Sequence, residues 1–271
     1  MALHDVVRIC AEQGFNFYKV RVMLLATGAL LGGLGITRAL HVTTGTATST
    51  IDVFTTSGEC NGIKAFLRLS AGLFVKASVP LGAYTVWYLR KGHIGLRLID
   101  CGPRAMAVAL LRQFTAGQGY CDGDGIRHPY PVLLDKGHTM TTPRTLPVEH
   151  DLECHIEVWK MIHVGIKYGF VWVSDFNEPH ICGRAFSCPA TFRDSRDAGW
   201  SFLRFPNSFT ATRYSPERAS WSLYGTGCDR GLLDDGSACP VPIARDDYWF
   251  ATIAAFIAMP SAPSVLKDYN T

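Results

Sequence analysis

One stretch of the chain, residues 72–95, constrains the fold more than any other. It reads GLFVKASVPLGAYTVWYLRKGHIG, is apolar and rich in small residues, and has Lys76 near its start and Arg90 and Lys91 at its close. A helix needs about 20 apolar residues to cross a bilayer, and cations at its ends hold it at the lipid headgroups. The stretch therefore predicts a short membrane-spanning helix over residues 69–89, with Lys76, Arg90 and Lys91 at the membrane interface.

A second apolar stretch, residues 22–37, carries no charged side chain over its 16 positions. It is close to the roughly 17 residues that the shortest membrane helices use. Its Gly28 and Gly32 have the G-x-x-x-G spacing that lets two helices pack closely in lipid. We expect Gly28 and Gly32, together with Gly82 and Ala83 of the first stretch, to lie at helix–helix contacts. For residues 22–37 the alternative is a Gly-rich loop or a core helix.

The composition of the 271-residue chain fits a membrane-associated protein. Charged residues make up 18% of it, against about 25% in average soluble domains. Hydrophobic residues make up 48% and the mean hydropathy is +0.11, which favours one to three membrane segments beside a sizeable extramembrane part. The net charge of +3 includes no long run of Lys and Arg, so nucleic acid is not an expected partner.

These patterns divide the chain into three parts. Residues 1–20 are expected to form an amphipathic N-terminal segment, and residues 21–114 a membrane-associated helical region. Residues 115–271 are rich in turns and scattered aromatic side chains, which indicates an irregular extramembrane region with a few strands and a C-terminal apolar helix. The predicted fold class is a mainly α membrane protein with one or two short transmembrane helices.

The nine cysteines leave two readings open. No C-x-x-C pair occurs, which disfavours zinc ribbons and thioredoxin-like motifs. If the C-terminal half faces an oxidising compartment, disulfides are expected between the pairs that are closest in sequence; otherwise the cysteines are buried free thiols. The expected pairs are Cys182 with Cys188 and Cys228 with Cys239.

Few residues have the spacing that catalysis or metal binding needs. His150, Cys154 and His155 could supply zinc ligands, although their spacing matches no standard zinc site. Gly32 and Gly33 suggest a dinucleotide-binding loop, with Asp52 about 20 residues later, where a ribose ligand is wanted. That reading is disfavoured because the glycine spacing is wrong and the preceding residues are interpreted as helix. We therefore expect no cofactor and no catalytic residue.

Residues 72–95 also resemble a known membrane segment. Phe74, Val75 and Lys76 open it, Gly82 and Ala83 follow at the expected offset, and Gly92 and Gly95 end it. In this the stretch resembles the small bridging subunit of MICOS, the complex that holds cristae junctions in the mitochondrial inner membrane. The resemblance implies a close-packed membrane span, and Leu81 and Pro80 depart from the family pattern.

Together these observations predict a non-catalytic accessory subunit of a mitochondrial inner-membrane assembly. That assembly would be a respiratory-chain complex or a MICOS-like cristae-organising scaffold. The expected partners are other membrane-protein subunits and lipid. The competing hypothesis is a membrane-anchored, metal-dependent enzyme that uses His150, Cys154 and His155.

Overall fold

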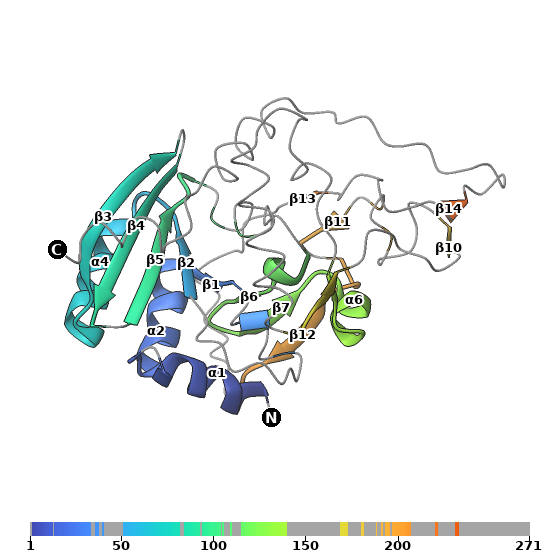
Figure 1. Cartoon of the computed structure of the whole chain (residues 1–271), viewed down its shortest axis with the longest axis horizontal. Coiled ribbons are helices and arrows are strands. Elements are labelled where there is room, and N and C mark those ends of the chain that lie inside the picture. The colour runs from blue at the N-terminus through green and yellow to red at the C-terminus, as the bar shows by residue number, and fades with distance from the viewer. Residues whose placement is uncertain are drawn as a thin grey trace.

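A mixed sheet of eight strands organises the computed structural model of this chain (Figure 1). Helix and strand occur in about equal amounts in it. The residues that the structure describes are 2–12, 14–33, 36–37, 40, 51–81, 84–92, 94–103, 105, 109, 115–139, 169–172, 180–181, 188, 191, 193–195, 197–206, 220–221 and 231–232.

The strand order shows that the sheet is built from segments far apart in the chain. From one edge to the other the strands are β12 (Ser201–Arg204), β7 (Gly125–His128), β6 (Tyr120–Cys121), β1 (Leu30–Gly32), β2 (Ile51–Thr55), β5 (Ile94–Asp100), β4 (Tyr84–Lys91) and β3 (Phe74–Leu81). Strands β2 and β5 pair in parallel, and the other neighbours pair antiparallel. The sheet thus takes strands from both sides of residue 115.

Three helices pack on one face of this sheet: α1 (Ala2–Glu12), α2 (Phe17–Thr27) and α4 (Cys60–Ala71). The buried positions of α4, which are Cys60, Ile63, Leu67 and Ala71, form the single apolar stripe of an amphipathic helix. They share one core cluster with the helix-facing strand positions Ile51, Val53, Leu96 and Leu98.

The opposite face of the sheet is also apolar at most positions. Its buried cluster includes Leu30, Phe54, Val86, Ile99 and Tyr120. Strands β2, β4 and β5 are therefore covered on both faces, and strands of this kind appear in the sequence as continuous apolar runs.

The predicted membrane helix over residues 69–89 is wrong, and with it the mainly α membrane fold class. The segment contains the end of α4 and the hairpin of β3 and β4, and residues 94 and 95 begin β5. The run is apolar because β4 is buried on both faces, with Tyr84, Val86 and Tyr88 on one side and Leu89 on the other. Of the helices that the structure describes, none has the length and apolarity that crossing a bilayer requires.

The predicted membrane helix over residues 22–37 is wrong for a different reason. Helix α2 ends at Thr27, and Gly28 caps it in the left-handed conformation with φ 66°, a backbone geometry that favours glycine. Gly32 then lies in strand β1. Gly28 and Gly32 do not share a helix, so the predicted helix–helix contact has no helix face on which to form.

Shorter elements complete the described part of the chain. They are the 3-10 turn η1 (Thr115–Gln118), the helix α6 (Pro131–Asp135) and three two-stranded ladders. The ladders join β8 (His138–Thr139) to β9 (Val171–Trp172), β10 (His180–Ile181) to β14 (Gly231–Leu232), and β11 (Arg193–Asp194) to β13 (Ser220–Trp221). Figure 1 shows α6 beside the β7 and β12 end of the sheet, away from β3 and α4.

Candidate functional site

The register of the central strands aligns four residues in one row across the sheet. Tyr88 of β4 pairs with Arg97 of β5, and Arg97 pairs with Asp52 of β2. Asp52 in turn pairs with Gly32 of β1. Side chains at paired positions point to the same face, and Phe54, two residues after Asp52, points there too. The row therefore places a charged pair on the apolar face that lies opposite the helices.

Arg97 and Asp52 form a bidentate ion pair within this row. Arg97 donates from Nε to Oδ1 of Asp52 at 2.7 Å and from Nη2 to Oδ2 at 2.9 Å. The side chain of Asp52 is 1% exposed and that of Arg97 is 20% exposed. A carboxylate this buried is costly unless a cation and hydrogen bonds compensate it. Arg97 supplies both, and the bidentate geometry fixes the direction of the guanidinium.

Burial is the main influence on the pKa values of Arg97 and of its neighbour Tyr88. Burial lowers the pKa of the Arg97 guanidinium and the Tyr88 side chain opposes that shift, but an arginine in a protein stays protonated. Burial raises the pKa of Tyr88, with Arg97 acting in the opposite direction. At neutral pH the row therefore contains a neutral phenol beside a charged guanidinium.

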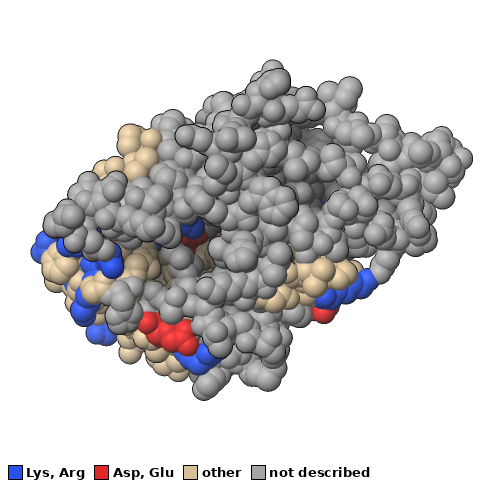
Figure 2. Space-filling view, in the orientation of Figure 1, with Lys and Arg blue, Asp and Glu red and all other residues tan. Residues whose placement is uncertain are grey.

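One side of the guanidinium remains for a further acceptor. The ion pair uses Nε and Nη2, and within the described residues no hydrogen bond forms from Nη1. Figure 2 shows a hollow on the face it views, with basic and acidic atoms at the floor, in the region where β1 and β2 lie in Figure 1. A guanidinium that is held in place and partly exposed suits recognition of an oxyanion, because its planar N–H groups match carboxylate and phosphate oxygens.

A glycine turn borders this pair. A Cβ on Gly32 would come within 2.6 Å of Cε2 of Phe54, so the Phe54 ring occupies the space beside the glycine. Gly33 has φ 97°, which only glycine adopts easily, and its carbonyl accepts from the Ile36 N–H at 3.1 Å. The residues before these glycines were expected to be helical. In the structure Gly32 ends strand β1, Gly33 follows it, and residues 36 and 37 are helical.

The cations predicted at the membrane interface lie elsewhere, around the end of the β3–β4 hairpin that meets α4. Lys76 is exposed on β3. On β4, Nε of Arg90 donates to the Gly92 carbonyl at 2.7 Å, and Nζ of Lys91 donates to the Ala71 carbonyl at 3.1 Å. A cation at the last carbonyls of a helix is favourable, so Lys91 stabilises the C-terminus of α4.

Several predicted site residues lie outside the described residues: Gly82, Ala83, His150, Cys154, His155, Cys182, Cys228 and Cys239. Cys188 is described and buried, but its expected partner is not, so both disulfides stay predictions. Across the residues that the structure describes, no group of three His, Cys, Asp or Glu side chains is arranged to hold a metal ion.

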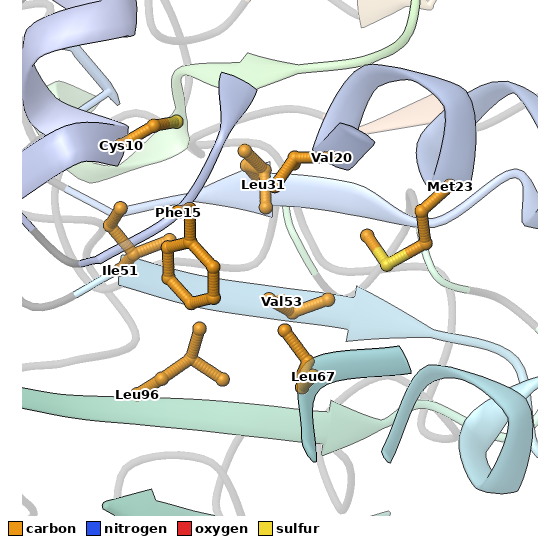
Figure 3. A pocket seen from close by; sticks show the side chains of 9 residues that line it. All are labelled: Cys10, Phe15, Val20, Met23, Leu31, Ile51, Val53, Leu67 and Leu96. Atoms are coloured by element: carbon orange, nitrogen blue, oxygen red, sulfur yellow. The ribbon is translucent and has the colours of Figure 1, made fainter. Parts of the chain in front are cut away.

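A small apolar pocket lies on the helix side of the sheet (Figure 3). Its lining consists of Cys10, Phe15, Val20, Met23, Leu31, Ile51, Val53, Leu67 and Leu96. Burial raises the pKa of the Cys10 thiol to about 12, so the thiol is protonated and unreactive at neutral pH. The pocket is a packing gap in the core and offers no group for chemistry.

Comparison with known proteins supplies no further constraint on this site. The chain matches no protein-family model, no curated protein and no solved structure. The geometry of the Arg97–Asp52 pair is therefore the starting point for a functional proposal.

Proposed function

We propose that this chain is a non-catalytic binding protein that holds a small oxyanion-bearing ligand, a phosphate or a carboxylate, at Arg97. The observation that carries the proposal is that, within the described residues, Arg97 donates from Nε and Nη2 but not from Nη1. Asp52 occupies Nε and Nη2, while Nη1 belongs to a side chain that is 20% exposed. A charge-assisted hydrogen bond from such a donor is stronger than one between neutral groups.

The role of Asp52 supports binding over catalysis. Both of its oxygens accept from Arg97 and its side chain is 1% exposed, so Asp52 is poorly placed to reach a substrate and take a proton from it. The same engagement opposes a role as a ligand for Mg²⁺ or Ca²⁺, which bind carboxylate oxygens directly. In this proposal Asp52 orients the arginine, and Arg97 contacts the ligand.

Isothermal titration calorimetry of the full chain with inorganic phosphate, and separately with acetate, tests the proposal. Arg97→Lys keeps the charge opposite Asp52 but loses the fixed fork, and we expect it to weaken binding about 10- to 100-fold. The matched control is Arg127→Lys, because Arg127 also pairs with an aspartate, Asp122, at 3.0 Å and is 28% exposed. Phosphate and acetate both failing to bind, or binding unchanged in Arg97→Lys, would contradict the proposal.

The accessory role in a larger assembly is a second part of the proposal. The prediction of a mitochondrial inner-membrane location rested on a membrane helix over residues 69–89, and the described residues there form the end of α4 and the strands β3 and β4. The location and the membrane-protein partners therefore need a test that does not depend on that helix. Cell fractionation, with isolation of co-purifying proteins from the mitochondrial fraction, provides it.

The competing hypothesis is a metal-dependent enzyme with His150, Cys154 and His155 as metal ligands. These residues lie outside the described residues. The hypothesis stays a prediction, and elemental analysis of the purified chain tests it directly. Stoichiometric zinc that is lost in His155→Ala would favour the enzyme.

A further inference from the structure

The charges of this chain are distributed unevenly in sequence. From Cys60 to Ile99 the chain contains six basic residues and no acidic residue, whereas the whole chain has a net charge of only +3. One of the six is Arg97, whose partner Asp52 lies before this segment. The other five are Lys64, Arg68, Lys76, Arg90 and Lys91.

Three large apolar side chains protrude in the same segment. Leu69 is 82% exposed on the outer side of α4, and Phe74 and Val75 at the start of β3 are 56% and 43% exposed. Gly72, with φ 68°, turns the chain between the helix and the strand. Phe74 pairs with Arg90 and Val75 with Leu89, so these two side chains point to opposite faces of the sheet at its β3 edge, beside the end of α4. Exposed apolar side chains around one such edge mark an interaction surface.

Cations surround these apolar side chains. Arg68 lies in the last turn of α4, Lys76 directly follows Val75, and Arg90 pairs in register with Phe74. Lys91 donates to the carbonyl of Ala71, the last residue of α4. Figure 2 shows basic side chains gathered around uncharged ones at the end of the molecule where α4 and β3 lie in Figure 1. We call the surface formed by these four cations and three apolar side chains the basic corner.

The basic corner has no internal charge compensation in the part of the chain that the structure describes. The ion pairs found there involve Arg8, Arg97, Arg127 and Arg193, and none involves a cation of the corner. Uncompensated Lys and Arg create a positive potential that attracts an anionic surface. Their long aliphatic stems also lie easily along apolar groups while the charges reach outward.

We propose that the basic corner binds the surface of an anionic membrane, with Leu69, Phe74 and Val75 entering the headgroup region. Proteins that lie on membranes combine apolar side chains that insert with Lys and Arg that contact acidic headgroups. An acidic peptide that adds a strand to the edge of β3 is disfavoured. The bulge between Val75 and Ala77 and the proline at position 80 both interrupt the edge hydrogen bonds that such a peptide would need.

Vesicle co-sedimentation of the full chain tests this surface. Phosphatidylcholine vesicles that contain phosphatidylserine should bind the chain, vesicles of phosphatidylcholine alone should not, and binding should weaken as salt is added. Removal of each basic residue near the membrane is expected to weaken binding about fivefold. The double variant with Arg68→Glu and Lys76→Glu should therefore lose at least about 25-fold, and Leu69→Ser should also weaken binding.

The matched control uses the exposed cation and apolar side chain of a different helix. Lys19 and Val22 of α2 are both exposed, Val22 at 62%, so the variant with Lys19→Glu and Val22→Ser should bind as the wild type does. Thermal melts confirm that each variant is folded. Equal binding to vesicles with and without phosphatidylserine would overturn the proposal, as would full binding by the double variant. Binding to poly-glutamate but not to vesicles would overturn it in favour of an acidic protein partner.

Discussion

Two arginine–aspartate pairs in this molecule share the same bidentate geometry. They differ in the described hydrogen bonds of the remaining arginine nitrogen, Nη1, and in how far the arginine is exposed. Arg193 donates to Asp197 from Nε at 2.7 Å and from Nη2 at 2.9 Å, as Arg97 does to Asp52. In addition, Nη1 of Arg193 donates to the Pro129 carbonyl at 2.7 Å, and the side chain is 0% exposed. For Arg97 the same nitrogen has no described acceptor, and the side chain is 20% exposed.

This difference suggests that the Arg193–Asp197 pair stabilises the fold, whereas the Arg97–Asp52 pair is suited to binding a ligand. Arg193 ties Asp197 to the Pro129 carbonyl and lies over the Tyr130 ring at 5.3 Å, so it joins segments of the chain that are far apart in sequence. Its hydrogen bonds would be lost without replacement if the arginine were removed. Arg97 is fixed by its aspartate equally well, but among the described residues nothing accepts a hydrogen bond from its Nη1. A partly exposed arginine whose direction is fixed by an ion pair has the preorganisation that ligand binding needs.

The largest effect on stability is expected from Arg193→Met. The change leaves the Asp197 carboxylate without its cation and the Pro129 carbonyl without its donor, so the free energy of unfolding should fall by about 3–5 kcal/mol. Urea unfolding followed by circular dichroism measures it. The control is Arg204→Met, because Arg204 is exposed and its described contact is the Phe202 ring at 6.0 Å; we expect about 0.5 kcal/mol or less there. A similar small loss in Arg193→Met would show that this pair is not the structural one.

Phosphate should then distinguish the two arginines. At about 100 times its dissociation constant, bound phosphate adds about 2.7 kcal/mol to the free energy of unfolding. The wild type should show this increment in urea unfolding, and Arg97→Lys should lose most of it. Phosphate also stabilises folded proteins in general, and the residual increment in Arg97→Lys measures that background. An equal increment in both proteins would mean that Arg97 does not bind the anion.

The apolar runs of the sequence correctly predicted which segments are removed from water. The prediction that the later run is a membrane helix was wrong, because it forms strands. Residues 84–89 carry no charge and bury side chains on both faces, and a membrane helix and a strand covered on both sides give the same uncharged run. A signal for the strand was present, because Pro80 is unfavourable inside a helix, and Tyr84, Thr85, Val86 and Trp87 favour strands.

The candidate site was harder to predict than the fold. Arg97 is the one charged residue among positions 94–99 of β5, and Asp52 is the one charged residue of β2, which suggests that each has a partner. Their pairing depends on the parallel register of β2 and β5, and 45 positions separate the two residues in sequence. Spacing alone cannot supply that register, because it is set by the packing of the whole sheet.

Gly32→Ala tests whether phosphate binding at the Arg97–Asp52 pair depends on the position of the neighbouring Phe54 ring. The new methyl would lie within 2.6 Å of the Phe54 ring, which must move, so we expect a loss of about 1–3 kcal/mol and weaker phosphate binding. Gly62→Ala is the matched control, because nothing lies within 4 Å of its Cβ and it is inside α4, where alanine is favoured by about 0.5–1 kcal/mol. Unchanged stability and phosphate affinity in Gly32→Ala would show that the position of the Phe54 ring does not matter to the site.

The smallest expected effect is the pH dependence of stability that comes from the Arg193–Asp197 pair. Burial raises the pKa of Asp197, but hydrogen bonds from Arg193 and from the backbone N–H groups of Asp194 and Gly199 lower it by more, so the net shift is downward. A carboxyl whose pKa is lower in the folded state stabilises the protein above its unfolded pKa of about 3.9, and that contribution is lost as the pH falls through the folded value. The stability difference between the wild type and Asp197→Asn should therefore be constant above about pH 5 and shrink towards about pH 2. Urea unfolding at a series of pH values measures the difference, and Asp135→Asn, on an exposed helix residue, controls for the general effect of removing a carboxylate. If the difference stayed constant down to pH 2, the Arg193–Asp197 pair would contribute through packing alone and not through charge.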